Sequence, residues 1–259
     1  MIFFTPKRLK WQLLCLLFIS IGLFVPANTI LANDSIHLYI DTSEGGTVSN
    51  FRLQSLKKYL RLKQCSIDEI SYGNKIADGS KFEFIFTALQ PSLPKQFVKI
   101  ADLKIIHNEK LSGSIIVRGA TGINNIANLA GVHIAFLSPE SITGYQLQQN
   151  LFKAALINHS EDKITFTQTN LAAISLLLHK DVFAAAIATP LAKKWAETND
   201  LIIVATSKEV KTGGLWVQQG VSSDIIDNCA KAFVQITKAE AGNQKLLRLF
   251  PAWLDSFTL

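Results

Sequence analysis

The sequence predicts an α/β fold with two lobes, and three observations lead to this prediction. Short apolar runs rich in Val, Ile and Phe alternate with stretches whose apolar residues recur at helical spacing, as is typical of βαβ units. Polar turn residues follow several of these runs, and open sheets of this kind bind ligands at the carboxyl ends of their strands. With 259 residues, 48% hydrophobic and 18% charged, the chain can bury a core of the size that two lobes need.

The first 32 residues have the features of a secretory signal peptide. Three basic residues precede an apolar run, residues 11–25, and small residues then lead to Ala32. We expect cleavage after Ala32, with Ala27 as the second choice, and a periplasmic protein that is not embedded in the membrane afterwards. A retained membrane anchor is the alternative, because the apolar run is about as long as a short spanning helix.

The charge and the cysteines of the remaining chain exclude some classes of function. Without the three basic residues of the leader, 23 of the 26 Lys and Arg stand against 20 Asp and Glu. No basic stripe interleaved with aromatic residues is present, so we expect no nucleic-acid partner. Cys65 and Cys229 either form a disulfide in an oxidising compartment or remain buried thiols, and their spacing does not indicate a metal site.

The first part of the chain begins with a strand at residues 35–40 and a polar loop at residues 41–46. The residues after the loop have amphipathic helical spacing, with basic residues on the polar side. Further on, β-branched and aromatic runs bounded by turn residues predict more strands. The elements that follow the loop are a helix over residues 48–61, strands at 67–72 and 82–86, and an extended run at 114–118.

The second part of the chain continues the alternation of strands and helices. We expect Asn170 to be the N-cap of one helix, and Thr189 to be the N-cap of another with Pro190 at its first position. The predicted elements are a short helix at 123–129, a strand at 132–137, a helix at 145–156, a strand at 164–166, a helix at 171–179, strands at 182–188 and 201–205, a returning strand at 213–217, and helices at 224–237 and 246–250.

The strand at residues 132–137 ends in a cluster of hydroxyl side chains at the start of a helix. Ser138, Ser141 and Thr143 fill the turn, and Gly144 and Tyr145 follow. The first backbone N–H groups of a helix have no partner within it and lie at the positive end of its dipole, so this arrangement predicts a site for an oxyanion. The alternative is simple capping of the helix, which Ser and Thr often provide.

This stretch resembles a signature of a known family. Leu129-Ala130-Gly131, a strand, and then the segment from Ser138 to Tyr145 are similar to the motif of the periplasmic phosphate, phosphite and phosphonate-binding proteins of ABC importers. The resemblance covers residues 114–259 best. It implies a two-lobed, periplasmic-binding-protein-like (type II) fold with two crossover strands, near residues 112–118 and 206–217. The expected division is a signal peptide at 1–32, lobe one at 33–113 and 214–259, and lobe two at 114–213.

The resemblance also implies which residues hold the ligand. In the family, hydroxyls of this turn bind the phosphonate oxygens; Ser141 and Thr143 retain a hydroxyl, whereas Ile142 replaces a threonine. Asn170 stands where the family often has a histidine that reaches the ligand, and an amide can still donate a hydrogen bond. The candidate ligand-binding residues are Ser138, Ser141, Thr143, Gly144, Tyr145, Asn170, Thr87 and Thr189.

One family feature is missing from the strand at residues 182–188. Two Asp residues of the family's motif are replaced here by Phe183 and Ala188. A carboxylate that could pair with the amino group of an aminoalkylphosphonate is therefore absent from this run.

We predict a solute-binding protein that captures a small oxyanion of the phosphate or phosphonate type for ABC import. The alternative is a periplasmic sensor or accessory protein with a degenerate cleft that signals to a membrane-bound regulator. We expect no enzyme, metal or cofactor, because the histidines are single and the sequence has no nucleophile elbow, phosphate loop or dinucleotide fingerprint. The expected partners are the small oxyanion and either an ABC permease or a membrane-bound sensor, and we expect a monomer.

Overall fold

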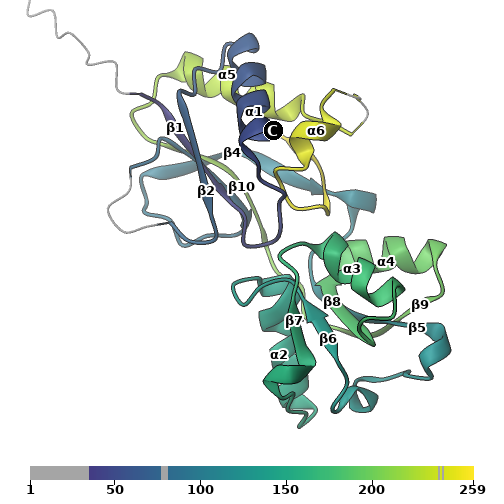
Figure 1. Ribbon diagram of the computed structural model, residues 1–259. Coiled ribbons are helices and arrows are strands. Elements are labelled where there is room, and N and C mark those ends of the chain that lie inside the picture. Colours follow the sequence, from purple (N-terminus) through teal and green to yellow (C-terminus); the bar gives the residue numbers. More distant parts are fainter. Residues whose placement is uncertain (1–34, 77–80, 239, 241) are drawn as a thin grey trace, which may run out of the picture. The chain divides into compact units, whose positions relative to one another are not determined.

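The computed structural model describes residues 35–76, 81–238, 240 and 242–259 (Figure 1). The predicted signal peptide lies outside these residues. Residues 35–259 form one compact unit that contains two β-sheets. Among the helices of this described part, none has both the length and the apolar character needed to cross a membrane.

The first sheet has six strands in the order β11-β4-β10-β3-β1-β2. β1 pairs in parallel with β2 and β3, whereas β10 is antiparallel to β3 and β4. The strands are β1 (His37–Asp41), β2 (Glu69–Gly73), β3 (Phe84–Leu89), β4 (Phe97–Ile105), β10 (Thr212–Gln218) and β11 (Leu254–Thr258), and the helices of this part are α1 (Asn50–Leu62), α5 (Ser223–Val234) and α6 (Gln244–Leu247).

The second sheet has five strands in the order β7-β6-β8-β5-β9. β6 pairs in parallel with β7 and β8, and β5 is antiparallel to β8 and β9. Its elements are β5 (Gly113–Arg118), β6 (Ile134–Phe136), β7 (Ile164–Phe166), β8 (Ala184–Ala188), β9 (Leu201–Thr206), α2 (Leu147–Ala154), α3 (Asn170–Leu178) and α4 (Thr189–Thr198). Short 3₁₀ turns cover Ile106–Asn108, Gly119–Thr121, Ile126–Leu129 and Glu161–Lys163, and a π-helix covers Ile142–Gln146.

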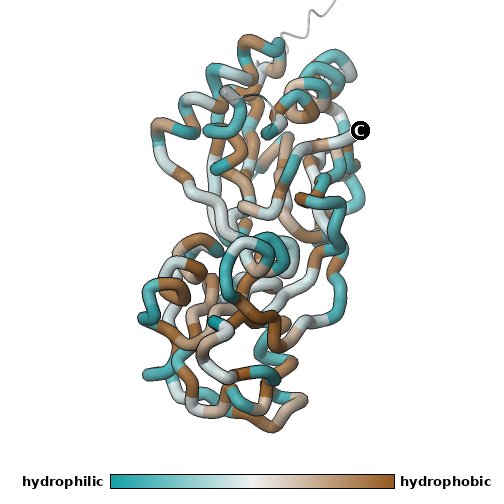
Figure 2. Tube along the Cα trace, turned by 90° about the vertical axis from the view of Figure 1, so that its right-hand side faces the viewer, coloured by the Kyte–Doolittle hydropathy of each residue, from teal (hydrophilic) through white to brown (hydrophobic). Residues whose placement is uncertain are grey.

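The core of the first sheet contains a cluster of aromatic rings. Phe86, Phe233, Phe250 and Phe257 are almost fully buried and contact one another edge to face, which is a favoured geometry for aromatic pairs. Hydrophobic and hydrophilic residues alternate along the helices in Figure 2, as expected for helices with one face on a core. The last strand, β11, lies in the same sheet as β1, the first described strand.

Cys65 and Cys229 form a disulfide, which decides between the two possibilities that the sequence left open. Cys65 lies just beyond the end of α1, and Cys229 lies in α5. Both are fully buried, so the bond joins these two helices inside the core.

The structure confirms the α/β two-sheet class and corrects several elements. The extended run at residues 114–118 pairs as β5 within the second sheet, and residues 106–112 and 207–211 connect the two sheets. The last predicted helix, residues 246–250, is present with other bounds: α6 covers Gln244–Leu247, and the chain then continues into β11. The nine-residue strand β4 was not predicted. The predicted division of the chain into lobes stays a prediction.

Candidate functional site

The hydroxyl-rich turn after β6 is built by its own side chains. The backbone N–H of Ser141 donates to Ser138 Oγ at 3.2 Å, and Ser141 Oγ accepts from the backbone N–H of Gly144 at 2.8 Å. The second bond is an N-cap for the helix that begins at Ile142. This first turn is a π-helix, because the N–H of Gln146 donates to the carbonyl of Ser141, five residues before it, at 3.0 Å. Single π turns of this kind often occur at functional sites.

The carboxylate of Glu44 lies on the donors of this helix start. The backbone N–H of Ile142 donates to Glu44 Oε1 at 2.6 Å, and that of Thr143 donates to the same oxygen at 3.3 Å. Ser141 Oγ donates to Glu44 Oε2 at 3.3 Å, and Thr143 Oγ1 also donates to Oε2. Glu44, Ser141 and Thr143 are all fully buried. The predicted oxyanion site therefore holds an oxyanion of the chain itself.

The loop after β1 has the backbone that brings Glu44 to this place. Gly45 has a φ of +83°, which residues other than glycine rarely adopt. A Cβ on Gly46 would lie 2.2 Å from the carbonyl oxygen of Leu249, so only glycine allows this close approach. The N–H of Thr47 then donates to the carbonyl of Arg248 at 2.8 Å. Two glycines and one backbone bond thus fix the loop against the segment after α6.

Asn170 contacts the same loop from the second sheet. Its Nδ2 donates to the backbone carbonyl of Glu44 at 3.4 Å, and its Oδ1 accepts from the N–H of Ala188 at 3.2 Å. The Asn170 side chain is almost fully buried. It therefore holds the Glu44 backbone while the turn at Ser141 to Thr143 holds the carboxylate.

Burial raises the pKa of the Glu44 carboxyl above its ordinary value, and the negative charge of Asp41 raises it further. The hydrogen bonds from Thr143 and Ile142 act in the opposite direction. Burial also raises the pKa of Asp41, whose Oδ1 accepts from the N–H of Ser43 at 2.9 Å. Within the described residues, no Lys, Arg or His forms an ion pair with Glu44. The carboxylate depends on hydrogen bonds and the helix dipole alone.

We expect the stability of the ligand-free protein to fall as the pH rises above about 4.5, the ordinary pKa of a Glu carboxyl. A carboxyl with a raised pKa binds more protons in the folded than in the unfolded state, so its contribution is complete below the ordinary pKa and is lost as the pH passes the folded one. Asp41 contributes with the same sign. Urea unfolding between pH 4.5 and 8 measures this slope, and Glu44→Gln should reduce it. An unchanged slope in that variant would contradict the assignment to Glu44.

The structure brings some of the predicted site residues together around Glu44 and gives the others different partners. Ser138, Ser141, Thr143 and Gly144 form the turn, and Asn170 lies beside it. Thr87 Oγ1 accepts from Trp216 Nε1 at 3.0 Å, Thr189 Oγ1 bonds to the hydroxyls of Ser112 and Ser114 at 2.7 and 2.8 Å, and the Tyr145 ring packs 5.2 Å from the rings of Phe136 and Phe166.

Two predicted N-caps are wrong by one residue. The cap of α3 is Thr169, whose Oγ1 accepts from the N–H of Ala172 at 3.1 Å, while Asn170 turns inward to Glu44. The cap position of α4 is Ala188. Thr189 is already helical, and its hydroxyl bonds to those of Ser112 and Ser114. In both cases the polar side chain bonds to the neighbouring strands instead of its own helix.

Glu44 is the functional residue that the sequence prediction missed. The loop at residues 41–46 was placed correctly at the carboxyl end of the first strand, and Glu44 is an acidic residue beside two glycines in it. An acidic residue in a loop at the carboxyl end of a strand was the one feature of the sequence that could have indicated Glu44 as a site residue. Nothing in the spacing of residues 44 and 141 in the sequence says that they meet.

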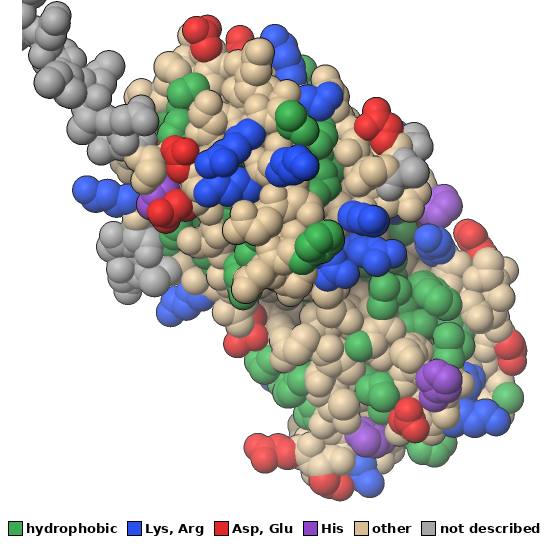
Figure 3. Space-filling view, turned by 45° about the horizontal axis from the view of Figure 1, so that its top comes forward, with side chains coloured by type: hydrophobic (Ala, Val, Ile, Leu, Met, Phe, Trp, Pro, Cys, Tyr) green, Lys and Arg blue, Asp and Glu red, His purple; other side chains and the backbone are tan. Residues whose placement is uncertain are grey.

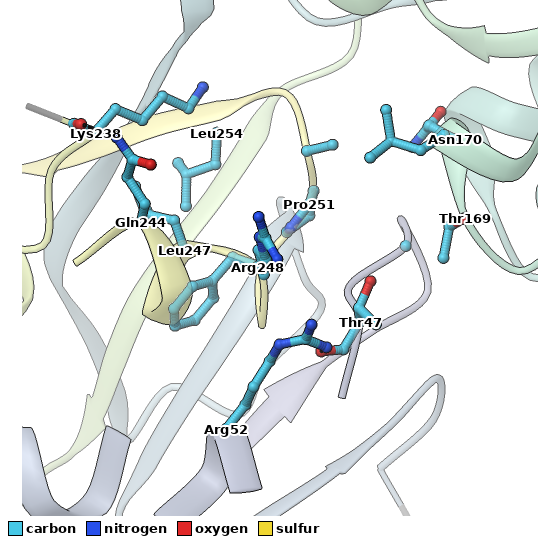
Figure 4. Close-up of a pocket in the computed structure, with 14 residues that line it drawn as sticks. Thr47, Arg52, Thr169, Asn170, Lys238, Gln244, Leu247, Arg248, Pro251 and Leu254 are labelled. Carbon is cyan, nitrogen blue, oxygen red and sulfur yellow. Dashed lines mark hydrogen bonds between the residues drawn. The ribbon is translucent and has the colours of Figure 1, made fainter. Parts of the chain in front are cut away.

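A basic cavity of about 530 Å³ adjoins the Glu44 loop (Figure 4). Arg52, Arg248 and Lys238 lie on one side, and Thr169 and Asn170 lie on the other. None of the described residues that line it is acidic, and much of its wall is apolar, from Leu171, Leu247, Phe250, Pro251, Ala252 and Leu254. On the face drawn in Figure 3, Lys and Arg side chains gather in groups, and single Asp and Glu side chains lie around them. The cavity suits an organic anion.

The described part of the chain contains no group of three or more His, Cys, Asp or Glu residues that could hold a metal ion. The polar side chains of the site are hydroxyls, an amide and one carboxylate. Such groups bind and orient a solute by hydrogen bonds.

Comparisons with known proteins identify a family and similar folds. Residues 97–259 match the family model described as "ABC transporter, phosphonate, periplasmic substrate-binding protein". The fold is similar to the binding protein component of an ABC phosphonate transporter from Pseudomonas aeruginosa, with a TM-score of 0.57, 14% identity, and 86% of this chain and 80% of that chain covered. It is also similar to PhnD1 from Prochlorococcus marinus in complex with methylphosphonate, with a TM-score of 0.52, 14% identity, and 86% and 91% covered. Among curated proteins, none matches this sequence.

Proposed function

Because the chain belongs to the family of periplasmic substrate-binding proteins of phosphonate ABC transporters, we propose that it captures a small oxyanion of the phosphate or phosphonate type. It acts in the periplasm as a monomer and delivers the solute to the permease of an ABC importer. One observation carries this proposal: the N–H groups of Ile142 and Thr143 and the hydroxyls of Ser141 and Thr143 all donate to the oxygens of one carboxylate. A helix start that holds a carboxylate in this way has the donors that an incoming oxyanion needs.

The geometry favours a tetrahedral oxyanion in the same place. A phosphonate offers three oxygens to donors that now share two, and charge-assisted hydrogen bonds to such oxygens are the strong ones. Ile142 contributes its backbone N–H but no hydroxyl. The site thus offers four hydrogen-bond donors to the solute, two from the backbone and two from side chains.

The neighbouring cavity supports an organic solute without an amino group. Arg52, Arg248 and Lys238 line it and no carboxylate does, so a second negative charge is favoured there and an ammonium group is not. Phe183, which replaces a family Asp, precedes β8, contacts the guanidinium of Arg118 at 6.0 Å and does not line this cavity. We propose an alkylphosphonate, or a phosphonate that carries a further acid, as the preferred class.

Methylphosphonate and phosphate are expected to raise the melting temperature of the purified protein. A solute at a hundred times its dissociation constant adds about 2.7 kcal/mol to the free energy of unfolding. For a chain of this size that corresponds to about 5–10 °C. Differential scanning fluorimetry with methylphosphonate, phosphate, phosphite, sulfate and 2-aminoethylphosphonate measures the shifts, with sodium chloride of equal ionic strength as the control. The aminoalkyl compound should give the smallest shift among the phosphonates. The proposal fails if every oxyanion behaves like chloride.

A second candidate function is supported by the position of Glu44. The chain's own carboxylate accepts from these donors, so the helix start has an internal anion. A sensor or accessory protein that signals to a membrane-bound regulator would need such a ligand-independent state. Uptake of radiolabelled methylphosphonate by cells separates the two functions, since deletion of this protein should abolish uptake if it delivers solute and leave uptake intact if it only signals.

A further inference from the structure

We infer that Glu44 is an internal competitor for the solute, so that an oxyanion binds only when it displaces the Glu44 carboxylate from the start of the helix at Ile142. This inference rests on the proposed function. The donors at Ser141, Ile142 and Thr143 already point at Glu44, and Glu44 and both hydroxyl residues are fully buried. No room is left for a second anion beside the first, and two buried like charges would repel each other.

The contacts of Glu44 are those of a group that can leave. Its carboxylate has no ion-pair partner among the described residues, and a buried charge without one is costly. Burial, together with the charge of Asp41, raises the pKa of the carboxyl above its ordinary value. The backbone beside the carboxylate is held by the Asn170 amide on the Glu44 carbonyl at 3.4 Å and by the Gly45 N–H on the Thr42 carbonyl at 3.0 Å, so the carboxylate leaves by rotation of its own side chain.

The basic cavity offers the displaced carboxylate a second place. Gly45, the residue after Glu44, lines this cavity together with Arg52 and Arg248. A carboxylate that leaves the helix start would meet water and the guanidinium groups that line part of this cavity. The solute gives up its own hydration to enter the site, while Glu44 regains hydration by leaving it.

Self-occupation sets the affinity and the selectivity of the site. The apparent dissociation constant equals the intrinsic one divided by the fraction of protein whose site is free, so a site that is self-occupied about 90–99% of the time binds about 10–100-fold more weakly. A tethered carboxylate acts at an effective concentration on the order of millimolar. Free monocarboxylates therefore cannot compete well, whereas a phosphonate with one more oxygen and more charge can. Glu44 thereby excludes weak anions from the site.

Isothermal titration of methylphosphonate into Glu44→Ala and Glu44→Gln tests the inference. Both variants should bind at least about tenfold more tightly than the unchanged protein. The control is Glu140→Gln, because Glu140 is an exposed carboxylate next to the same turn, so its removal changes the local charge but none of the contacts. It should change the affinity by less than about twofold, as expected for a screened surface charge.

The outcomes separate this inference from the proposed function. If neither the unchanged protein nor the Glu44 variants bind methylphosphonate or phosphate, the proposed function fails. If the unchanged protein binds and the Glu44 variants bind equally or more weakly, the inference fails and the function stands.

Carboxyl footprinting of the unchanged protein tests the same inference without any substitution. Carbodiimide coupling followed by mass spectrometry should leave Glu44 unlabelled in the free protein, because it is fully buried. Saturation with methylphosphonate should then raise its labelling several-fold, while the labelling of Glu140 stays constant. Continued protection of Glu44 in the saturated protein would overturn the inference even if the variants did not fold.

Discussion

Replacement of Thr143 by valine is expected to lower the free energy of unfolding of the ligand-free protein by about 1.5–3 kcal/mol, the usual contribution of a hydrogen bond to a charged group. Valine has nearly the shape of threonine, so the core around it keeps its packing. The substitution removes the hydroxyl that donates to Glu44 Oε2. Because Thr143 and Glu44 are both fully buried, water does not take its place. Urea unfolding of the two proteins at neutral pH measures the difference.

A double-mutant cycle shows whether the loss belongs to the pair of Thr143 and Glu44. In a Glu44→Ala background the carboxylate is gone, so Thr143→Val should cost less than about 1 kcal/mol, and the coupling energy should reach about 1–2 kcal/mol. The matched control is Thr189→Val. That hydroxyl is also buried, but it bonds to the neutral hydroxyls of Ser112 and Ser114 and shares no partner with Glu44. Its cost should be the same in both backgrounds, and a Thr143 cost that is equally insensitive to Glu44 would contradict the assignment.

A substitution in the turn is expected to have two opposing effects on the affinity for the solute. Removal of a donor at Thr143 weakens the intrinsic hold on an oxyanion and also weakens the competing hold on Glu44. The two effects partly cancel in the unchanged chain, so the full loss of solute affinity appears only in the Glu44→Ala background. A substitution of Ser141 would have a third effect, the loss of the helix cap, because its hydroxyl also accepts from the N–H of Gly144. Thr143 is therefore the cleaner probe of the two hydroxyls.

Much of the fold could be predicted because its signals are local. The apolar runs that became β1, β3, β5, β6 and β8 are bounded by turn residues, and α1 has a clear amphipathic spacing. The strand β4 also has such a signal, since Ala101, Leu103 and Ile105 are buried and alternate with exposed Asp102 and Lys104. Pro91, Ser92 and Pro94 also supply a turn signal before it, so the sequence contains more evidence for β4 than the prediction used. β11 has no comparable signal: it is a short edge strand whose pairing with β4 comes from tertiary packing.

Only the hydrogen-bond donors of the site could be predicted from the sequence. The donors at Ser141 and Thr143 follow from the local sequence, because a hydroxyl-rich turn before a helix leaves backbone N–H groups free. Their occupant could not be predicted, because Glu44 lies 97 residues from Ser141 and reaches it only through the arrangement of the two sheets. The predicted caps at Asn170 and Thr189 are wrong for a similar physical reason. Asn170 bonds to backbone groups of Glu44 and Ala188, and Thr189 bonds to the hydroxyls of Ser112 and Ser114, so neither side chain caps its own helix.

Loss of the disulfide is expected to lower the free energy of unfolding by about 2–5 kcal/mol, which is typical for a native disulfide that closes a long loop. Cys65 and Cys229 are 164 residues apart, and the bond restricts the unfolded chain over most of its length. The double variant Cys65→Ala/Cys229→Ala removes it without leaving buried polar atoms. Urea unfolding of this variant and of the unchanged protein, each with and without dithiothreitol, measures the effect. The reductant should destabilise the unchanged protein and leave the variant unaffected.

The compartment in which the chain folds then decides whether this stabilisation is present. A periplasm keeps such cysteines oxidised, whereas the reducing cytosol keeps them as thiols. The chain purified from the periplasm should therefore be more stable than the same chain retained in the cytosol by deletion of residues 2–32, by the amount that the cysteine variant loses. Equal stability of the two preparations, with the thiols of the cytosolic form still free to react after unfolding, would mean that packing around α1 and α5 holds these helices without the bond. A difference of the expected size would show that the stability of this protein depends on its export.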